Sequence, residues 1–118
     1  MEVSLIVSSF DRLLLPAPIV TVDGHSTIIW LSGEQDLAVV EALRAALRTV
    51  ALSPPADHEH VVVDLRGVTF IDSATVQALI DATLRQPGAA PTIILRAPSG
   101  RVRRMFDMCG RGDLLDTA

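Results

Sequence analysis

Apolar residues recur along the chain at two spacings, one typical of strands and the other typical of helices. Short apolar runs at residues 19–22 and 27–31 flank Asp23-Gly24-His25, an arrangement that predicts a β-hairpin closed by a glycine-containing turn. Residues 61–65 and 92–95 are continuous, mainly aliphatic runs, the pattern of strands covered on both faces. One hairpin and two buried strands are therefore expected.

Three amphipathic helices are predicted, because apolar side chains recur three and four residues apart. The first follows a short loop at residues 32–35, is capped by Asp36 and runs to about residue 51. The last is capped by Ser99 and ends at Gly110, a typical C-cap glycine. The expected apolar faces are Leu37, Val40, Leu43, Leu47 and Val50 in the first helix, Val76, Leu79, Ile80, Thr83 and Leu84 in the second, and Val102, Met105, Phe106 and Cys109 in the third.

Strands separated by helices imply parallel pairing through right-handed crossovers. The predicted fold is α/β: a mixed, mostly parallel β-sheet opened by an antiparallel hairpin, with helices packed against the sheet. A chain of 118 residues is long enough for one domain, which we expect at residues 17–118. Residues 1–16 are expected to form an N-terminal arm or an added edge strand.

Composition narrows the possible functions. Acidic residues outnumber basic ones by 14 to 10 and aromatic residues make up 3%, which argues against nucleic-acid binding. All ten basic residues are arginines, so sites that need a phosphate-loop or Schiff-base lysine are excluded. We see no nucleophile–base pair, phosphate loop or metal cluster, and so expect no enzyme and no cofactor.

The sequence also predicts where the protein resides. No apolar stretch approaches the roughly 18 residues that a membrane-spanning helix needs, and no signal peptide is evident. The single cysteine, Cys109, cannot form an intrachain disulfide, which fits a reducing compartment. A soluble cytoplasmic protein without direct membrane insertion is expected, and monomer and weak dimer both stay open.

Several isolated residues have a simple structural interpretation. His58 and His60 could be two metal ligands on one strand face, but no further ligand accompanies them, so a solvated loop is favoured and no metal is expected. Asp64, at the end of a buried strand, could act as a base or a metal ligand; we favour acceptance of backbone N–H groups from the turn that follows. Cys109 is expected to be a buried thiol. The basic residues Arg101, Arg103 and Arg104 form either a docking patch for an acidic partner or a solvated face.

Residues 68–79 carry Asp, Ser and Thr side chains between a buried strand and a helix. Their simplest role is capping, with Asp72 or Ser73 accepting N–H bonds from the first turn. The alternative is functional, because helix N-termini attract anions and a phosphate placed there strongly alters the local charge.

Residues 61–79 resemble the signature of the STAS domain, which runs as a valine-rich strand, Asp-Leu, a short turn and Phe-Ile-Asp-Ser. Residues 31–36, Leu-Ser-Gly-Glu-Gln-Asp, are similar to the family's Leu-x-Gly-Glu-Leu-Asp before its first helix. Residues 97–115 are similar to its final helix and Leu-Leu exit. The three matches lie in the family's order and cover about residues 17–116.

The resemblance implies an anti-sigma factor antagonist, a switch module rather than an enzyme. Antagonists of this family bind an anti-sigma factor that is a GHKL-type serine kinase, and the binding releases a sigma factor. The kinase then phosphorylates a Ser or Thr at the start of the second helix, and the complex dissociates. A second function of STAS domains stays open, that of an accessory subunit in a membrane transport complex.

The sequence departs from the family pattern where the phosphate is normally added. Ala74 stands at the phosphoacceptor position, so its hydroxyl is lost, and Thr75 stands where the family has Gly. Helix geometry predicts that Ala74 faces outward, Ser73 leans toward the core and Thr75 lies on the flank. Either the domain is not switched off by phosphorylation, or Thr75 or Ser73 is a displaced acceptor. We favour the first hypothesis, because Ser73 is better placed as a cap.

The partner interface expected from these matches combines the loop before the first helix, the start of the second helix and exposed residues next to them. It consists of Gly33, Glu34, Asp36, Asp72, Ser73, Ala74, Thr75, Gln77 and Asp81.

Overall fold

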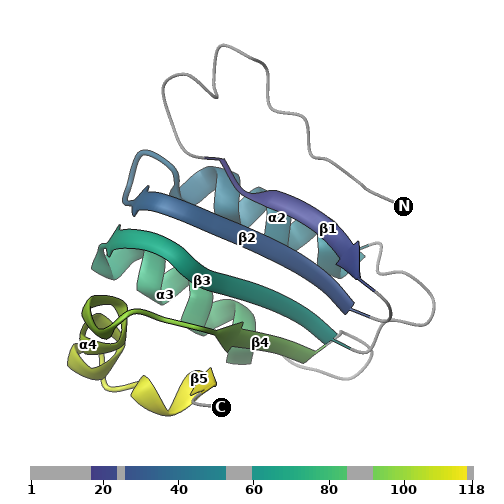
Figure 1. Ribbon diagram of the computed structural model, residues 1–118. Helices are drawn as coiled ribbons and strands as arrows, with labels where there is room; N and C mark the ends of the chain where they lie inside the picture. The colour runs from purple at the N-terminus through teal and green to yellow at the C-terminus, as the bar shows by residue number, and fades with distance from the viewer. Residues whose placement is uncertain (1–16, 24–25, 53–59, 85–91, 117–118) are drawn as a thin grey trace.

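The computed structural model describes residues 17–23, 26–52, 60–84 and 92–116 (Figure 1). In chain order the elements are β1 (Ile19–Asp23), β2 (Ser26–Gln35), α2 (Val40–Leu52), β3 (His60–Ile71), α3 (Ser73–Leu84), β4 (Thr92–Arg96), α4 (Gly100–Met108), the short 3₁₀ helix η1 (Gly112–Leu114) and β5 (Leu115–Asp116). The arm or edge strand expected at residues 1–16 lies outside the described residues.

Within the described ranges, the strands form one five-stranded sheet in the order β1-β2-β3-β4-β5. β1 and β2 are antiparallel, whereas the β2–β3, β3–β4 and β4–β5 pairs are parallel. The predicted mixed α/β sheet opened by a hairpin is therefore confirmed.

β2 and β3 are both longer than predicted. Residues 32–35, expected as a loop, extend β2 and pair with residues 67–71 of β3 through two register shifts. Gly33 adopts a positive φ of 71° at the second shift, a conformation that glycine adopts without strain. A Cβ atom at Gly67 would lie 3.2 Å from the Leu31 carbonyl oxygen, so glycine permits the close approach of the two strands there. The sheet consequently extends to the start of α3.

The helices α2, α3 and α4 contribute to a core on one face of the sheet, and Figure 1 shows α2 and α3 side by side behind it. The helices supply Leu43, Leu47 and Val50 from α2, Val76, Leu79, Ile80 and Ala82 from α3, and Val102 and Phe106 from α4. The strands supply Val20, Ile29, Leu31, Val61, Val63, Leu65, Val68, Ile71, Leu95 and Leu115. Among the described residues, no helix is long and apolar enough to cross a membrane.

Local signals at α4 were predicted correctly. The Ser99 side chain accepts the Val102 N–H at 3.3 Å, and Gly110 adopts φ 78° just after the helix. Met105 and Cys109 pack partly buried against the core, as their spacing predicts.

Two predicted core positions are wrong. Leu37 is 70% exposed, because α2 begins only at Val40. Asp36 instead holds the turn before the helix: its Oδ1 accepts the Ala38 N–H at 3.0 Å. Leu84 is exposed as well, since it is the last residue of α3.

Candidate partner-docking face

Asp72 is the residue that caps α3. Its Oδ1 accepts the Thr75 N–H at 2.9 Å, and its carbonyl oxygen accepts the Val76 N–H at 3.0 Å. Ser73 is the first residue of the helix, and its side chain is exposed. Of the two capping residues considered, the structure therefore selects Asp72, and the expectation that Ser73 serves as the cap is wrong.

The orientation of the first turn differs from the prediction. Ser73 points outward, Ala74 is half-buried and Thr75 is fully buried, with 0% exposure. α3 buries more than one apolar stripe, because it packs on the sheet between α2 and α4. Its buried residues are Thr75, Val76, Ala78, Leu79, Ile80 and Ala82. The resulting inward arc is wide enough to include Thr75, so the prediction that Ser73 leans inward and Thr75 lies on the flank is wrong.

The end of β2 and the start of α3 are joined through one carbonyl group. The Gln35 carbonyl oxygen accepts the Asp72 N–H at 3.0 Å and the Thr75 hydroxyl Oγ1 at 3.2 Å. Gln35 itself is buried, and its side-chain Nε2 donates to the Ser32 carbonyl oxygen at 2.8 Å. The two segments of the expected interface are thus brought to the same edge of the sheet.

The remaining expected interface residues lie on or beside this edge. Glu34 is exposed, and Gly33 and Asp36 are half-exposed. Gln77 and Asp81 are exposed one and two turns further along α3, where Gln77 Nε2 donates to Asp81 Oδ1 at 2.9 Å. Thr75 is the expected interface residue that the structure places inside the protein.

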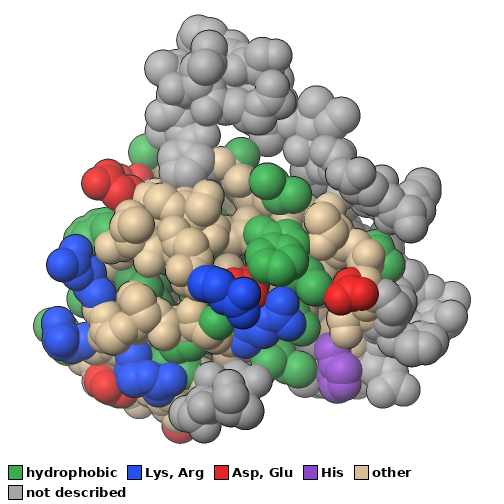
Figure 2. Space-filling view, in the orientation of Figure 1, with side chains coloured by type: hydrophobic (Ala, Val, Ile, Leu, Met, Phe, Trp, Pro, Cys, Tyr) green, Lys and Arg blue, Asp and Glu red, His purple; other side chains and the backbone are tan. Residues whose placement is uncertain are grey.

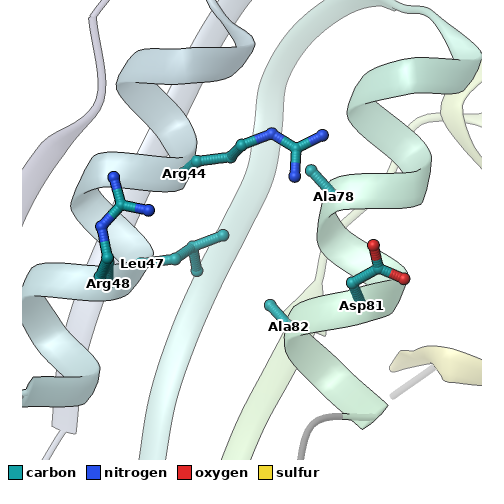
Figure 3. A pocket seen from close by; sticks show the side chains of 6 residues that line it. All are labelled: Arg44, Leu47, Arg48, Ala78, Asp81 and Ala82. Atoms are coloured by element: carbon teal, nitrogen blue, oxygen red, sulfur yellow. The ribbon is translucent and has the colours of Figure 1, made fainter.

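A shallow groove of about 130 Å³ continues from this helix face between α2 and α3 (Figure 3). It is lined by Arg44, Leu47, Arg48, Ala78, Asp81 and Ala82. The small alanine side chains of α3 leave the space, and the Arg44 and Arg48 side chains border it from α2 (Figure 3).

Two exposed apolar residues near this edge were not among the interface residues predicted from the sequence. Leu37 is exposed in the turn before α2, and Phe70, 43% exposed, pairs with Glu34 in β2. The adjacent apolar residues Phe70 and Ile71 carried a signal, because neighbouring strand residues point to opposite faces and only one of them can enter the core. No comparable signal exists for Leu37, whose spacing fits the helix that follows.

Asp64 is a structural residue on the sheet face opposite the helices. It is 1% exposed; its Oδ1 accepts the Arg66 N–H at 2.8 Å, and its Oδ2 accepts the Arg96 Nε at 2.8 Å. The Arg96 guanidinium also lies 5.7 Å from the centre of the Trp30 ring. Figure 2 shows basic side chains beside an apolar one in the middle of this face. The predicted acceptance of backbone N–H from the following residues is confirmed.

The other candidates do not converge on a site in the described part of the chain. His60 is exposed at the start of β3, and His58 lies outside the described residues. Cys109, expected as a buried thiol, is only half-buried, because it lies at the C-cap of α4. Arg101 and Arg104 are exposed on α4, while Arg103 is half-buried. Within the described ranges, no three His, Cys, Asp or Glu side chains are grouped so that they could hold a metal ion.

Known proteins resemble this chain in sequence and in fold. The family model described as Mlab, STAS domain matches residues 20–116. The anti-sigma factor antagonist SpoIIAA in its unphosphorylated form is similar with a TM-score of 0.72 and 25% identity, covering 86% of this chain and 88% of that one. An anti-sigma factor antagonist from Mycobacterium paratuberculosis is similar in fold, with a TM-score of 0.69 and 23% identity over 80% of this chain and 77% of that one.

One protein of similar fold is a transporter. Murine Solute Carrier 26 family member A9, an anion transporter, gives a TM-score of 0.58 at 17% identity, covering 73% of this chain but 14% of that one. Comparison with curated proteins found no match.

Proposed function

The chain belongs to the STAS domain family, and from that premise we propose that it is an anti-sigma factor antagonist. In this role it binds an anti-sigma factor of the GHKL-type serine kinase class in the cytoplasm and thereby releases a sigma factor. It acts by binding alone and carries out no reaction of its own.

The observation that carries the proposal is the extent of the match to SpoIIAA. The likeness covers 86% of this chain and 88% of SpoIIAA, whereas the transporter likeness covers 14% of the transporter. The likeness therefore extends over most of a known antagonist, which supports the proposal.

We further propose that the chain is not switched off by phosphorylation at the family's usual position. Ala74 has no hydroxyl, and the Thr75 hydroxyl is buried and bonded to the Gln35 carbonyl oxygen. A kinase could reach Thr75 only after the first turn of α3 had opened. Ser73 has an exposed side chain, so of the two displaced phosphoacceptors considered it is the one that a kinase could reach in the folded protein.

Titration of the purified chain against each recombinant GHKL-type kinase encoded in its source genome tests the binding. One kinase is expected to form a stable complex that also excludes its sigma factor. Mass spectrometry after incubation of that complex with ATP tests the switch, and residues 73–75 are expected to stay unmodified. Stoichiometric phosphate on Ser73 would overturn the phosphorylation-independent mechanism while leaving antagonist function intact.

The transporter likeness supports a second candidate, an accessory subunit of a membrane transport complex. The two candidates predict different partners. A complex with a transport protein, formed while every GHKL-type kinase fails to bind, would replace the first proposal with the second.

A further inference from the structure

Two large apolar side chains are exposed at the edge of the sheet where the candidate docking face lies. Leu37 is 70% exposed in the turn between β2 and α2, and Phe70 is 43% exposed near the end of β3. Phe70 pairs with Glu34 across the strands, and Leu37 follows Glu34 by three residues in the chain. Single exposed apolar residues are common on protein surfaces, so these two gain meaning only from what holds and surrounds them.

The backbone keeps both side chains outside the core. The Asp36 carbonyl oxygen accepts the N–H groups of Val39 and Val40 at 2.9 and 3.1 Å, which closes the turn around Leu37. Val39 is buried just after it, and Ile71 is buried just after Phe70. Because these neighbours already occupy the inward positions, Leu37 and Phe70 are presented to solvent by ordered structure.

The two segments that carry these side chains hold one sign of charge. Residues 33–38 and 68–77 contain Glu34, Asp36 and Asp72 and no basic residue. A partner surface complementary to these two segments therefore combines apolar contact area with positive charge, since like charges facing each other oppose association.

We infer that Leu37 and Phe70 are the apolar contacts of the docking face, and that the partner offers an apolar patch ringed by Arg or Lys side chains. The inference rests on the proposed function, because it gives the chemistry of the kinase surface that this face would bind. Large apolar side chains near the centre of an interface supply most of its affinity, whereas surrounding charges set the association rate and its salt dependence.

The affinity and association rate of single variants for the kinase test whether the apolar side chains supply affinity and the charges set the association rate. Leu37→Ala and Phe70→Ala are each expected to weaken binding by about tenfold or more. Leu84→Ala and Met108→Ala are matched controls, since these side chains are 53% and 74% exposed at the ends of α3 and α4. Both controls are expected to leave the affinity within about twofold, as residues outside an interface do. Glu34→Arg is expected to slow association, and added salt is expected to slow association of the unmodified chain.

The possible outcomes separate this inference from the proposed function. If the unmodified chain binds no GHKL-type kinase, the proposed function fails and the inference fails with it. If it binds and Leu37→Ala and Phe70→Ala match the controls, the inference alone is overturned. Association that is insensitive to salt and to Glu34→Arg would overturn the basic character assigned to the partner. Leu37→Met, which keeps an apolar side chain of similar size, is expected to retain binding and shows that a loss in Leu37→Ala reflects lost contact.

Discussion

The hydroxyl Oγ1 of Thr75 donates a hydrogen bond to the carbonyl oxygen of Gln35 over 3.2 Å, between residues that lie 40 positions apart in the chain. The same oxygen accepts the Asp72 N–H, so the end of β2 and the first turn of α3 share one acceptor. The family's usual glycine at position 75 would lack this hydroxyl. Together with the Asp72 N–H bond and the pairing of Gln35 with Ile71, Thr75 therefore helps to fix the two halves of the candidate docking face relative to each other.

Replacement of Thr75 tests this fixing role. Thr75→Val keeps the shape but removes the donor, and we expect a loss of about 1 kcal/mol in the free energy of unfolding, typical of one buried hydrogen bond. Thr75→Ser keeps the hydroxyl and is expected to retain the bond while losing one methyl group. Urea denaturation followed by circular dichroism measures both. Equal stability of Thr75→Val and the unmodified chain would show that the bond contributes nothing.

The first turn of α3 gives a second prediction, on capping. Asp72→Ala removes the acceptor of the Thr75 N–H and is expected to cost about 1 kcal/mol of stability, whereas Asp72→Asn keeps an acceptor and costs less. Ser73→Ala serves as the matched control, because the exposed Ser73 is not the cap. The thermal midpoint is expected to be highest for Ser73→Ala, lower for Asp72→Asn and lowest for Asp72→Ala. A Ser73→Ala variant as unstable as Asp72→Ala would contradict the assignment.

These capping contacts show which features could be predicted from the sequence. Ser99 and Gly110 at α4 were assigned correctly because a cap depends on a few neighbouring residues. The strand and helix order likewise followed from local spacing. Leu37 was misplaced because the start of α2 depends on how far β2 stays paired with β3, which is a long-range property.

Thr75 shows the same limit at the candidate site. A helical wheel assigns one buried stripe, but α3 contacts the sheet and two helices, so its buried arc is wider than apolar spacing indicates. The motif match pointed to two segments that the structure brings to one edge of the sheet, since their order in the family sets their place in the fold. It could not give the direction of each side chain, which depends on the packing around α3.

The ion pair of Asp64 gives a third prediction. Arg96→Met removes the 2.8 Å partner of a carboxylate that is 1% exposed, and we expect a loss of about 2 kcal/mol, typical of a buried hydrogen bond to a charged group. Arg66→Met is the matched control: its side chain lies 3.8 Å from the carboxylate and is 72% exposed, so a loss below about 1 kcal/mol is expected. Chemical denaturation at neutral pH measures both variants. Equal losses would mean that Arg96 is not the principal partner of Asp64.

The docking face itself is tested by a negative charge at position 74. Ala74 is half-buried, between the exposed Ser73 and the buried Thr75, so a longer side chain there extends from the edge of the face. Ala74→Glu adds a charge to a surface that already holds Glu34 and Asp72, and a partner that desolvates this edge must bury or repel that charge. We expect at least tenfold weaker kinase binding, with a far-ultraviolet circular dichroism spectrum like that of the unmodified chain.

Ala74→Gln separates charge from size in this experiment, because glutamine has nearly the same shape as glutamate and no charge. If only side-chain size matters, both variants lose the same affinity. If charge matters, Ala74→Glu binds the kinase more weakly than Ala74→Gln does, and this difference in affinity shrinks as added salt screens the repulsion. An unchanged affinity for both variants would place the partner elsewhere on the domain. A loss of affinity confined to Ala74→Glu would instead mean that negative charge at this position opposes docking, although Ala74 has no hydroxyl to which a kinase could add a phosphate.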